Sequence, residues 1–316
     1  MTPKQHSTPP ERLRAGRRTV EIGRPDKVLF PGDGISKSDL AGYYRTVAPR
    51  ILPHLRGRPL MLERHPDGID GPAFMQKDVP DHFPDWIHRA ELPKEDGTVT
   101  YALCDDTATL LYLAGQACIT PHRFLSKAER PGHPDRLVFD LDPAGDDFAP
   151  VRDAARGLHH LLGELELPSL LMTTGSRGLH VVIALDGRAP FDEVRAFARG
   201  VAGVLAARHP DRFTTEPRKK DRRGRLFLDI GRNAYAQTAV TPYAVRARPG
   251  APVAAPLAWS DLDDPRLTAR RWTLSTIDGL LADDPWTTPP RPRSLRNARA
   301  LLTALAPDEG TPQHAV

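Results

Sequence analysis

The segment RLVFDLD at residues 136–142 constrains the fold of this chain more than any other part of the sequence. Its apolar residues, followed at once by a proline, predict a β-strand. Because side chains alternate between the two faces of a strand, Asp140 and Asp142 share one face, and Leu137 and Phe139 lie on the other. Two carboxylates on one side of an apolar strand repel each other unless a cation neutralises them. Hard oxygen ligands of this kind suit magnesium or manganese.

The two acids also have a simpler explanation, because aspartate is common where a strand ends in a turn before a proline. A second strand-like run, residues 225–230, carries Asp229 among apolar neighbours, where an isolated acid again needs a partner. Three carboxylates from two strands form the ligand set expected for a two-metal phosphoryl-transfer site. We therefore predict that Asp140, Asp142 and Asp229 meet in one cleft.

A glycine-rich segment, TTGSRGLH at residues 173–180, lies between these two acidic strands. Its glycines allow the backbone to approach an anion closely, and Ser176 and Arg177 can donate hydrogen bonds to phosphate. His180 begins the next predicted strand and can reach the same phosphates. An ordinary turn would explain the segment by itself, but its position between the acidic strands favours a cradle for a triphosphate.

Helical and strand-like patterns alternate along the chain. Ser36 followed by Asp39 resembles a helix cap, and apolar residues then recur at helical spacing. Three further helices are predicted at residues 105–118, 150–165 and 191–208. Two further strands are predicted at residues 179–185 and 238–246. This order favours an α/β or α+β domain with a sheet at its centre.

The composition excludes several classes of protein. The 316 residues are 40% hydrophobic and 27% charged, which is typical of a soluble globular protein, and no apolar run is long enough to span a membrane. The N-terminus is polar and does not resemble a secretory signal, so we expect a cytoplasmic protein with no membrane partner. Cys104 and Cys118 are too few for a disulfide framework or a zinc ribbon, and we expect both to be buried thiols.

Positive charge is concentrated in two stretches, although the formal net charge is only +4. One stretch is residues 1–20, which we expect to be a flexible basic arm. The other is residues 218–225, where six of eight side chains are cationic. Either stretch could be a solvated loop or a polyanion-binding surface, but the second leads directly into the Asp229 strand, which favours polyanion binding.

The motifs D-L-D-P, G-S-R-G-L-H-V and L-D-I-G-R-N together resemble the three motifs of the archaeo-eukaryotic primase superfamily. More closely, the chain resembles the polymerase domain of bacterial ATP-dependent DNA ligase D over residues 20–290, including R-P-D-K-V-L-F-P at 24–31 and F-M-Q-K at 74–77. The resemblance implies an α+β fold, with a central, mostly antiparallel sheet flanked by helices and an N-terminal α/β subregion. It implies a catalytic domain at 21–295, between the arm 1–20 and a C-terminal helix or tail at 296–316.

The resemblance also implies roles for particular residues. Asp140, Asp142 and Asp229 are expected to bind two divalent metals, Mn²⁺ or Mg²⁺. The expected contacts to the incoming nucleotide are Ser176, Arg177, His180, Arg246, His122 and Phe74. The expected pocket for a DNA 5′-phosphate is formed by Lys27, Lys37 and Arg24. Arg177 and Arg24 stand where the family usually has Lys and Asn.

The function implied is a DNA-directed nucleotidyltransferase, or primase-polymerase, that adds nucleoside triphosphates to 3′ ends at gaps or double-strand breaks in non-homologous end joining. Ribonucleotides are the expected preference, and the nucleoid is the expected place of action. No nucleotidyl-lysine ligase signature is present, so we expect either a stand-alone polymerase module or an excised domain, with a separate ligase and a Ku-like end-binding protein as the expected partners. A non-catalytic DNA-end scaffold and a metal-dependent phosphoesterase or nuclease are the alternatives.

Overall fold

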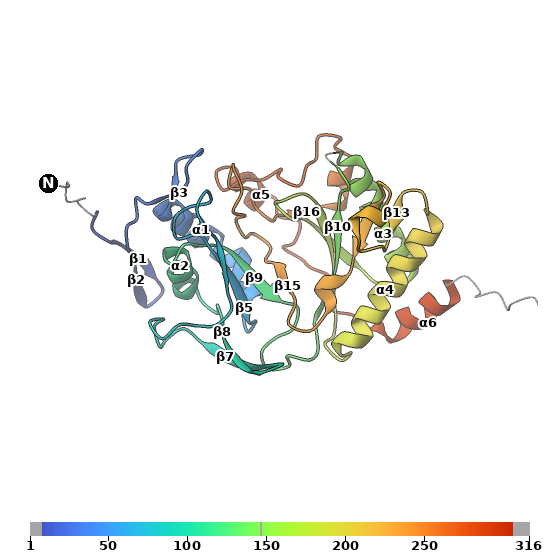
Figure 1. The fold of residues 1–316 in the computed structure, drawn as a ribbon, viewed down its shortest axis with the longest axis horizontal. Helices are drawn as coiled ribbons and strands as arrows, with labels where there is room; N and C mark the ends of the chain where they lie inside the picture. The colour runs from blue at the N-terminus through green and yellow to red at the C-terminus, as the bar shows by residue number, and fades with distance from the viewer. Residues whose placement is uncertain (1–7, 146, 306–316) are drawn as a thin grey trace, which may run out of the picture.

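The structure is a computed structural model that describes residues 8–145 and 147–305. Two sheets form the framework, with the N-terminal elements on one side and the helices α3, α4 and α6 on the other (Figure 1). The larger sheet is antiparallel except for one parallel pair at its edge. This confirms the α+β class with a central, mostly antiparallel sheet. None of the described helices is both long and apolar enough to cross a bilayer.

The larger sheet has six strands and is formed by the second half of the chain. Its strands, in spatial order, are β13 (Phe213–Thr214), β14 (Leu226–Asp229), β10 (Arg136–Asp142), β12 (Leu179–Ala184), β11 (Ser169–Thr173) and β16 (Pro256–Leu257). The predicted strand 136–142 is therefore a central strand. It pairs with β12 on one side and with β14 on the other.

Strand alternation gives this sheet two chemically different faces. Leu137, Phe139 and Leu141 join a core under helices α3 (Ala149–Glu164) and α4 (Phe191–Arg208). Val138 faces the opposite way and belongs to the second core, on the side of the N-terminal elements. Asp140 and Asp142 share that second face, so the helices do not cover the acidic face. The predicted separation of acidic and apolar residues is confirmed.

The smaller sheet has four antiparallel strands, with β15 (Thr238–Val240), β9 (Cys118–Phe124), β5 (Leu60–Arg64) and β6 (Phe74–Gln76) in that order. Helices α1 (Lys37–Leu55) and α2 (Thr107–Gly115) pack in the second core, which also contains Val138 and residues of this smaller sheet. Ser36 and Asp39 form the predicted capping box at the start of α1. The predicted strand 238–246 ends early at Val240, because Pro242 follows and Tyr243 has a φ of 67°.

Part of the expected N-terminal arm is ordered secondary structure, so the expectation of a flexible segment 1–20 is wrong from residue 11 onward. β1 (Glu11–Ala15) and β2 (Arg18–Ile22) form a hairpin whose Leu13, Val20 and Ile22 are buried. The arginines alternate with these residues and face the solvent, which is why the segment has a basic composition. Residues 1–7 lie outside the described part of the chain.

Two more hairpins extend the N-terminal half. They are β3 (Val28–Phe30) with β4 (Ile35–Ser36), and β7 (Arg89–Lys94) with β8 (Gly97–Ala102). Cys104 and Cys118 are free and buried, as predicted.

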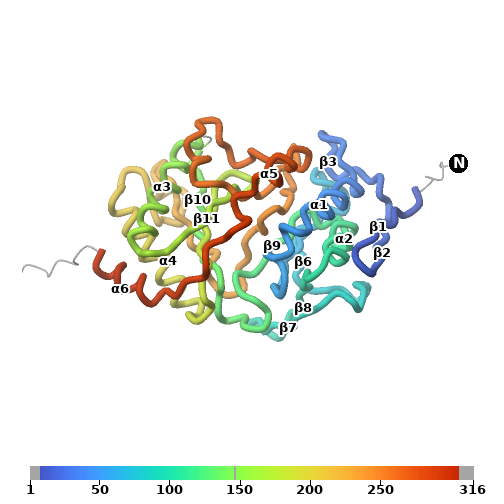
Figure 2. Tube along the Cα trace, turned by 180° about the vertical axis from the view of Figure 1, so that it is seen from behind, coloured from blue at the N-terminus to red at the C-terminus, as the bar shows by residue number. Residues whose placement is uncertain are grey.

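The C-terminal segment ties the two halves together. After α5 (Asp278–Ala282), the chain runs along the back of the molecule to α6 (Leu295–Leu305) (Figure 2). On the way, the Asp284 carboxylate accepts a hydrogen bond from the Tyr243 hydroxyl at 2.6 Å, and the Trp286 indole donates to the Leu171 carbonyl of β11 at 3.1 Å. These contacts fix the position of one half relative to the other. Part of the expected C-terminal helix or tail, residues 306–316, lies outside the described residues.

Candidate active site

A row of polar side chains crosses the face of the larger sheet that helices α3 and α4 do not cover. Asp140 on β10 lies directly opposite His180 on β12 and directly opposite Asp229 on β14. Residues opposite each other in neighbouring antiparallel strands point to the same face. Asp142 lies two residues further along β10 and therefore joins them on that face. The structure thus brings the three predicted acids to one side of one sheet.

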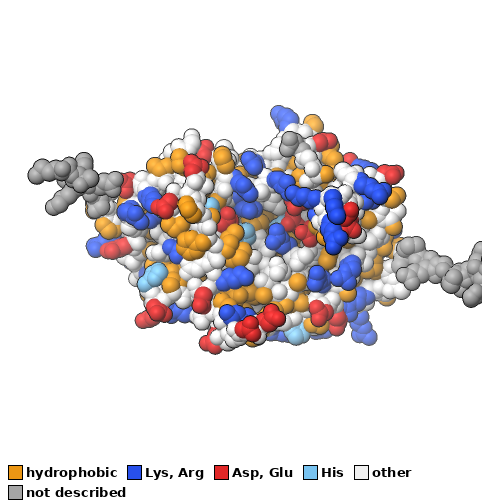
Figure 3. Space-filling view, in the orientation of Figure 1, with side chains coloured by type: hydrophobic (Ala, Val, Ile, Leu, Met, Phe, Trp, Pro, Cys, Tyr) orange, Lys and Arg blue, Asp and Glu red, His pale blue; other side chains and the backbone are white. Residues whose placement is uncertain are grey.

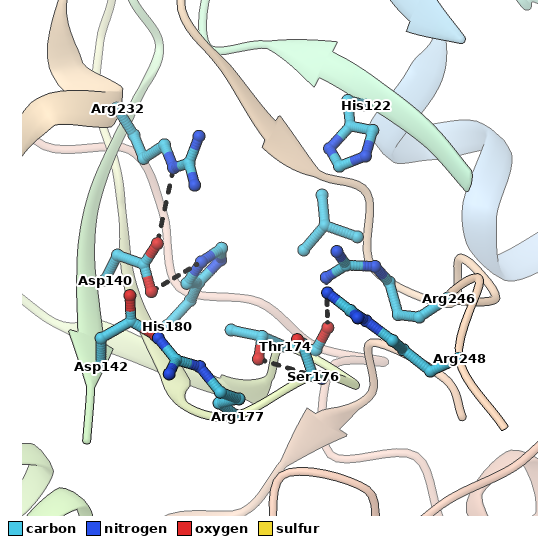
Figure 4. Close-up of a pocket in the computed structure, with 11 residues that line it drawn as sticks. His122, Asp140, Asp142, Thr174, Ser176, Arg177, His180, Arg232, Arg246 and Arg248 are labelled. Atoms are coloured by element: carbon cyan, nitrogen blue, oxygen red, sulfur yellow. Dashed lines mark hydrogen bonds and ion pairs between the residues drawn. The ribbon is translucent and has the colours of Figure 1, made fainter. Parts of the chain in front are cut away.

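Positive groups already surround the most buried of these acids. Asp140 is 5% exposed, and its two oxygens lie 3.4 Å from the His180 Nε2 and 3.4 Å from the Arg232 Nε (Figure 4). Burial alone raises the pKa of Asp140, but the neighbouring His180 and Arg232 outweigh burial and hold the pKa below its ordinary value. Asp140 is therefore a carboxylate at neutral pH.

Asp142 has the opposite balance. Burial and the negative charges of Asp140 and Asp229 raise its pKa, and Arg177, 3.7 Å away, and His180 oppose them without reversing the shift. The Asp229 Oδ1 accepts a hydrogen bond from the Gly231 amide at 2.7 Å. The mutual repulsion of these carboxylates, felt most at Asp142, is a condition under which a divalent cation is attracted.

The residues present fit a hard divalent cation, because all three acids offer oxygen ligands on one face of a rigid sheet. Over residues 8–145 and 147–305 no group of three or more His, Cys, Asp or Glu side chains is already arranged around one point. Arg232 and His180 lie beside Asp140 and offset the negative charge of its carboxylate. Sequence reasoning missed Arg232, although it stands in the quoted motif L-D-I-G-R-N.

A cavity of about 230 Å³ lies beside the acids, between the two sheets. Figure 3 shows basic side chains around the hollow on this side of the molecule. Eleven residues line the cavity: His122, Asp140, Asp142, Thr174, Ser176, Arg177, His180, Arg232, Val240, Arg246 and Arg248. Four of the eleven are arginines, so the cavity is suited to a ligand with several negative charges.

The predicted phosphate loop forms one wall of this cavity, and two glycines make its shape possible. A Cβ atom on Gly178 would lie 2.1 Å from the Leu141 carbonyl oxygen, so the loop packs directly on β10. Gly175 has a φ of +63°, and a Cβ atom there would lie 2.7 Å from the Arg246 Cγ. Only glycine fits at either position without displacing the backbone.

Thr174, which sequence analysis did not single out, holds this loop in place. Its hydroxyl accepts hydrogen bonds from the amides of Ser176 and Gly178, at 3.3 and 3.2 Å. Its carbonyl accepts a hydrogen bond from Arg246 at 2.8 Å. The loop and Arg246 are therefore fixed relative to each other. Ser176 and Arg177 line the cavity, and Arg177 lies beside Asp142 (Figure 4).

Two buried hydroxyl groups position the backbone next to Arg246. The Val245 amide donates to the Tyr44 hydroxyl at 3.2 Å, and the Val245 carbonyl accepts from the Thr120 hydroxyl at 2.8 Å. Tyr44 in turn donates to the Ile119 carbonyl at 2.5 Å. These side chains add to the backbone hydrogen bonds between residues 243–246 and 252–254, and together these contacts fix the backbone beside Arg246.

The basic run 218–225 lies beside the acidic strand β14, as its place in the sequence suggests. It contains the short 3₁₀ helix η1 (Lys219–Asp221), whose side chains are exposed. The Arg222 guanidinium lies over the Phe227 ring at 4.1 Å, and Phe227 is the register partner of Asp142. The run therefore places cations next to the acidic face.

Phe74 lies outside the cavity lining. It is on the edge strand β6 and 45% exposed, so it is not a core residue. The Arg64 guanidinium lies 5.1 Å from the centre of its ring. One face of the ring thus packs on Arg64, and an exposed aromatic ring of this kind can stack on a base.

Arg24, Lys27 and Lys37 form a separate cluster around the β3–β4 hairpin. The Lys37 ammonium is buried and donates to the Gly23 carbonyl at 2.9 Å, and Lys27 pairs with Asp67 at 2.7 Å. Burial and the charges of Arg24, Lys27 and Arg64 lower the pKa of Lys37 to about 8. Such crowding of cations favours binding of an anion.

Arg24 has a φ of 51° in this cluster. Few residues other than Gly, Asn and Asp adopt this region readily, so Arg carries some backbone strain here. The requirement for this backbone conformation gives a physical reason for Asn at this position in the family that the sequence resembles.

Comparisons with known proteins agree with this geometry. The family model of the LigD primase-polymerase domain matches residues 36–286. Relatives include the multifunctional non-homologous end joining protein LigD of Mycobacterium bovis, 37% identical over 262 residues, and that of Pseudomonas aeruginosa, 32% identical over 280 residues. These matches cover 80% and 86% of this chain. The chain spans about a third of the length of these relatives, 34% and 33%.

A solved structure has the same fold. The polymerase domain of Mycobacterium tuberculosis ligase D, in complex with DNA, matches with a TM-score of 0.78 and 34% sequence identity. The match covers 84% of this chain and 95% of that domain. With a family model that matches most of the chain, and relatives of this similarity, the chain belongs to the LigD primase-polymerase domain family.

Proposed function

We propose that this protein is a nucleotidyltransferase that extends the 3′ end of a DNA strand with nucleoside triphosphates at gaps and breaks, in non-homologous end joining. One observation carries the proposal: Asp140 and Asp142 line a cavity together with four arginines, and Asp229 lies opposite Asp140 on the same sheet face, outside the cavity lining. The acids suit divalent cations and the arginines suit a triphosphate. Both are required for transfer of a nucleotidyl group.

The acids and the arginines of the site have separate roles in this reaction. Asp140, Asp142 and Asp229 would hold one or two Mn²⁺ or Mg²⁺ ions, which would lower the pKa of the attacking hydroxyl and offset charge on the leaving group. Arg177, Arg246 and the loop amides bind the triphosphate and hold its α-phosphorus in line with the primer 3′-oxygen. The 3′-oxygen bonds to that phosphorus, the bond to the bridging oxygen breaks, and pyrophosphate leaves.

The N-terminal half binds DNA in this proposal. Lys27 and Lys37, with Arg24, would bind the 5′-phosphate on the far side of a gap, and Phe74 would stack on a base. Ribonucleotides are the proposed substrates, and a Ku-like protein and a separate ligase are the proposed partners. The DNA in the related solved structure supports the DNA-binding role, and the names of the relatives support the place in non-homologous end joining.

Primer extension on a gapped duplex with a 5′-phosphate tests the function directly. We expect the wild-type protein to add nucleotides and release pyrophosphate, and Asp140→Asn to lose at least about a hundredfold in rate, as expected when a group that stabilises developing charge is removed. Asp211→Asn, which changes an exposed acid at the end of α4, is the matched control and is expected to keep full activity.

The same assay separates the alternatives. A nuclease or phosphoesterase would shorten the primer or release phosphate without needing a triphosphate. A scaffold would bind the gapped DNA and release no pyrophosphate. Extension by Asp140→Asn at the wild-type rate would contradict the proposed site.

A further inference from the structure

His122 and Glu63 form a largely buried pair at the edge of the cavity, with side chains 13% and 15% exposed. His122 projects into the cavity from β9, opposite the strand that carries Asp140 (Figure 4). Glu63 lies on β5, two residues along from Met61, the register partner of His122, and so on the same face. The His122 Nε2 lies 3.0 Å from one oxygen of Glu63, and the His65 Nε2 lies 3.4 Å from the other.

This contact determines which ring nitrogen of His122 carries hydrogen. Burial raises the pKa of Glu63, but the hydrogen bonds from His122 and His65 outweigh burial and hold the pKa well below its ordinary value. Glu63 is therefore a carboxylate, which accepts hydrogen bonds and donates none. The His122 Nε2 must carry the hydrogen, and Nδ1 is left for the cavity.

The surroundings of His122 favour the neutral ring. Burial lowers its pKa, Glu63 opposes the shift, and the positive charges of Arg246 and Arg232 add to it. A neutral ring with hydrogen on Nε2 has a lone pair on Nδ1. Within the described part of the chain, this Nδ1 has no hydrogen-bond partner, so it is an acceptor that awaits a donor from a ligand.

A nucleoside triphosphate offers few donors to such an atom. Its phosphate oxygens at neutral pH only accept hydrogen bonds, and the four arginines of the cavity already provide donors for them. The sugar hydroxyls are donors. We propose that Glu63 is a positioning residue that fixes the tautomer of His122, so that the His122 Nδ1 accepts a hydrogen bond from a sugar hydroxyl of the bound nucleotide. The proposal rests on the proposed function, since it requires a nucleotide in the cavity.

Nitrogen NMR of labelled histidine tests the tautomer without relying on activity. In the wild-type protein with magnesium and a non-hydrolysable nucleoside triphosphate, we expect His122 to show a protonated Nε2 and an unprotonated Nδ1. Glu63→Gln keeps an acceptor at the same place and is expected to preserve this pattern, whereas Glu63→Leu is expected to show both tautomers. A doubly protonated ring in the nucleotide complex would mean a phosphate contact and would overturn the inference.

Single-nucleotide extension then identifies the hydroxyl. The kcat/KM of the wild-type protein for a ribonucleoside triphosphate is compared with that for the 2′-deoxy and the 3′-deoxy analogue. We expect one analogue to be poorer by about three- to tenfold, the value of one neutral hydrogen bond. Glu63→Leu is expected to remove most of this difference and Glu63→Gln to retain it. Glu91→Leu, which removes an exposed carboxylate of β7, is the control and is expected to retain it as well.

The two proposals fail in different ways. Absence of incorporation of any nucleotide by the wild-type protein would refute the proposed function. Normal incorporation with equal kcat/KM for all three sugars, or with a difference that Glu63→Leu leaves unchanged, would refute the role of Glu63 and leave the function intact.

Discussion

Binding of a 5′-phosphorylated gap should weaken as the pH rises through the pKa of Lys37. This ammonium is buried, and burial together with Arg24, Lys27 and Arg64 lowers its pKa to about 8. It is then about nine tenths protonated at pH 7 and about one tenth at pH 9. A 5′-phosphate is already doubly charged over most of this range, since its second pKa is about 6.

The magnitude follows from these populations. A bound phosphate stabilises the charged lysine, so the affinity follows the protonated fraction of the free protein and should fall about tenfold between pH 7 and pH 9, or about 1.4 kcal/mol. The affinity for the phosphorylated duplex falls with rising pH, because the Lys37 ammonium that binds the anion loses its proton. Fluorescence anisotropy on two gapped duplexes, identical except for the 5′-phosphate, measures the effect.

The unphosphorylated duplex is the internal control, and its affinity should change little over the same range. Lys37→Gln should bind both duplexes with similar affinity and lose the pH dependence specific to the phosphorylated one. Equal weakening of both duplexes in the wild-type protein, or a constant ratio from pH 7 to pH 9, would refute the assignment of Lys37 to the 5′-phosphate.

Three further predictions address the positioning of the site. Tyr44→Phe leaves the Val245 amide without its acceptor, so it should lower the free energy of unfolding by about 1–3 kcal/mol and raise the KM for nucleotide. An unchanged KM in a folded variant would contradict the role of Tyr44 in positioning Arg246. Gly178→Ala should displace the phosphate loop from β10 and lower kcat/KM more than tenfold, while Gly163→Ala on α3, where a Cβ atom has open space, should not. Phe74→Ala should change the free energy of unfolding by less than about 1 kcal/mol, because nearly half of the residue's surface is exposed, yet raise the KM for nucleotide; a normal KM would exclude stacking.

The parts of the fold that depend on local alternation could be predicted from the sequence. The strand 136–142 was predicted with the observed bounds, because its apolar residues fall on the α3 side and its acids on the other. The capping box at Ser36 was also readable, since its two partners are three residues apart. Both features depend on neighbours in the chain, and tertiary contacts strengthen them.

The parts that were missed depend on long-range packing. The β1–β2 hairpin was hidden by its arginines, although Leu13, Val20 and Ile22 alternate with polar residues and could have revealed it. The strand expected at 238–246 stops at Val240, because Pro242 follows and Tyr243 has a φ of 67°, and Tyr44 and Thr120 then bind the Val245 backbone from elsewhere in the chain.

The site was partly predictable for the same reason. Ser176, Arg177 and His180 lie in one short motif and line the cavity as a group. Glu63 is 59 residues from His122 in the sequence, and nothing local to either residue indicates that the two are in contact. Arg232 stands in the quoted motif L-D-I-G-R-N and Arg248 in none, and only the folded chain shows that both line the cavity.

The proposed nucleotidyl transfer depends most on the three carboxylates and a divalent cation beside the arginine-lined cavity. Anomalous diffraction from crystals grown with Mn²⁺ and a non-hydrolysable nucleoside triphosphate measures this directly. We predict manganese peaks bound by Asp140, Asp142 and Asp229, with the triphosphate between these peaks and Arg246. A triphosphate bound elsewhere, or manganese that leaves these three acids without a metal, would contradict the account.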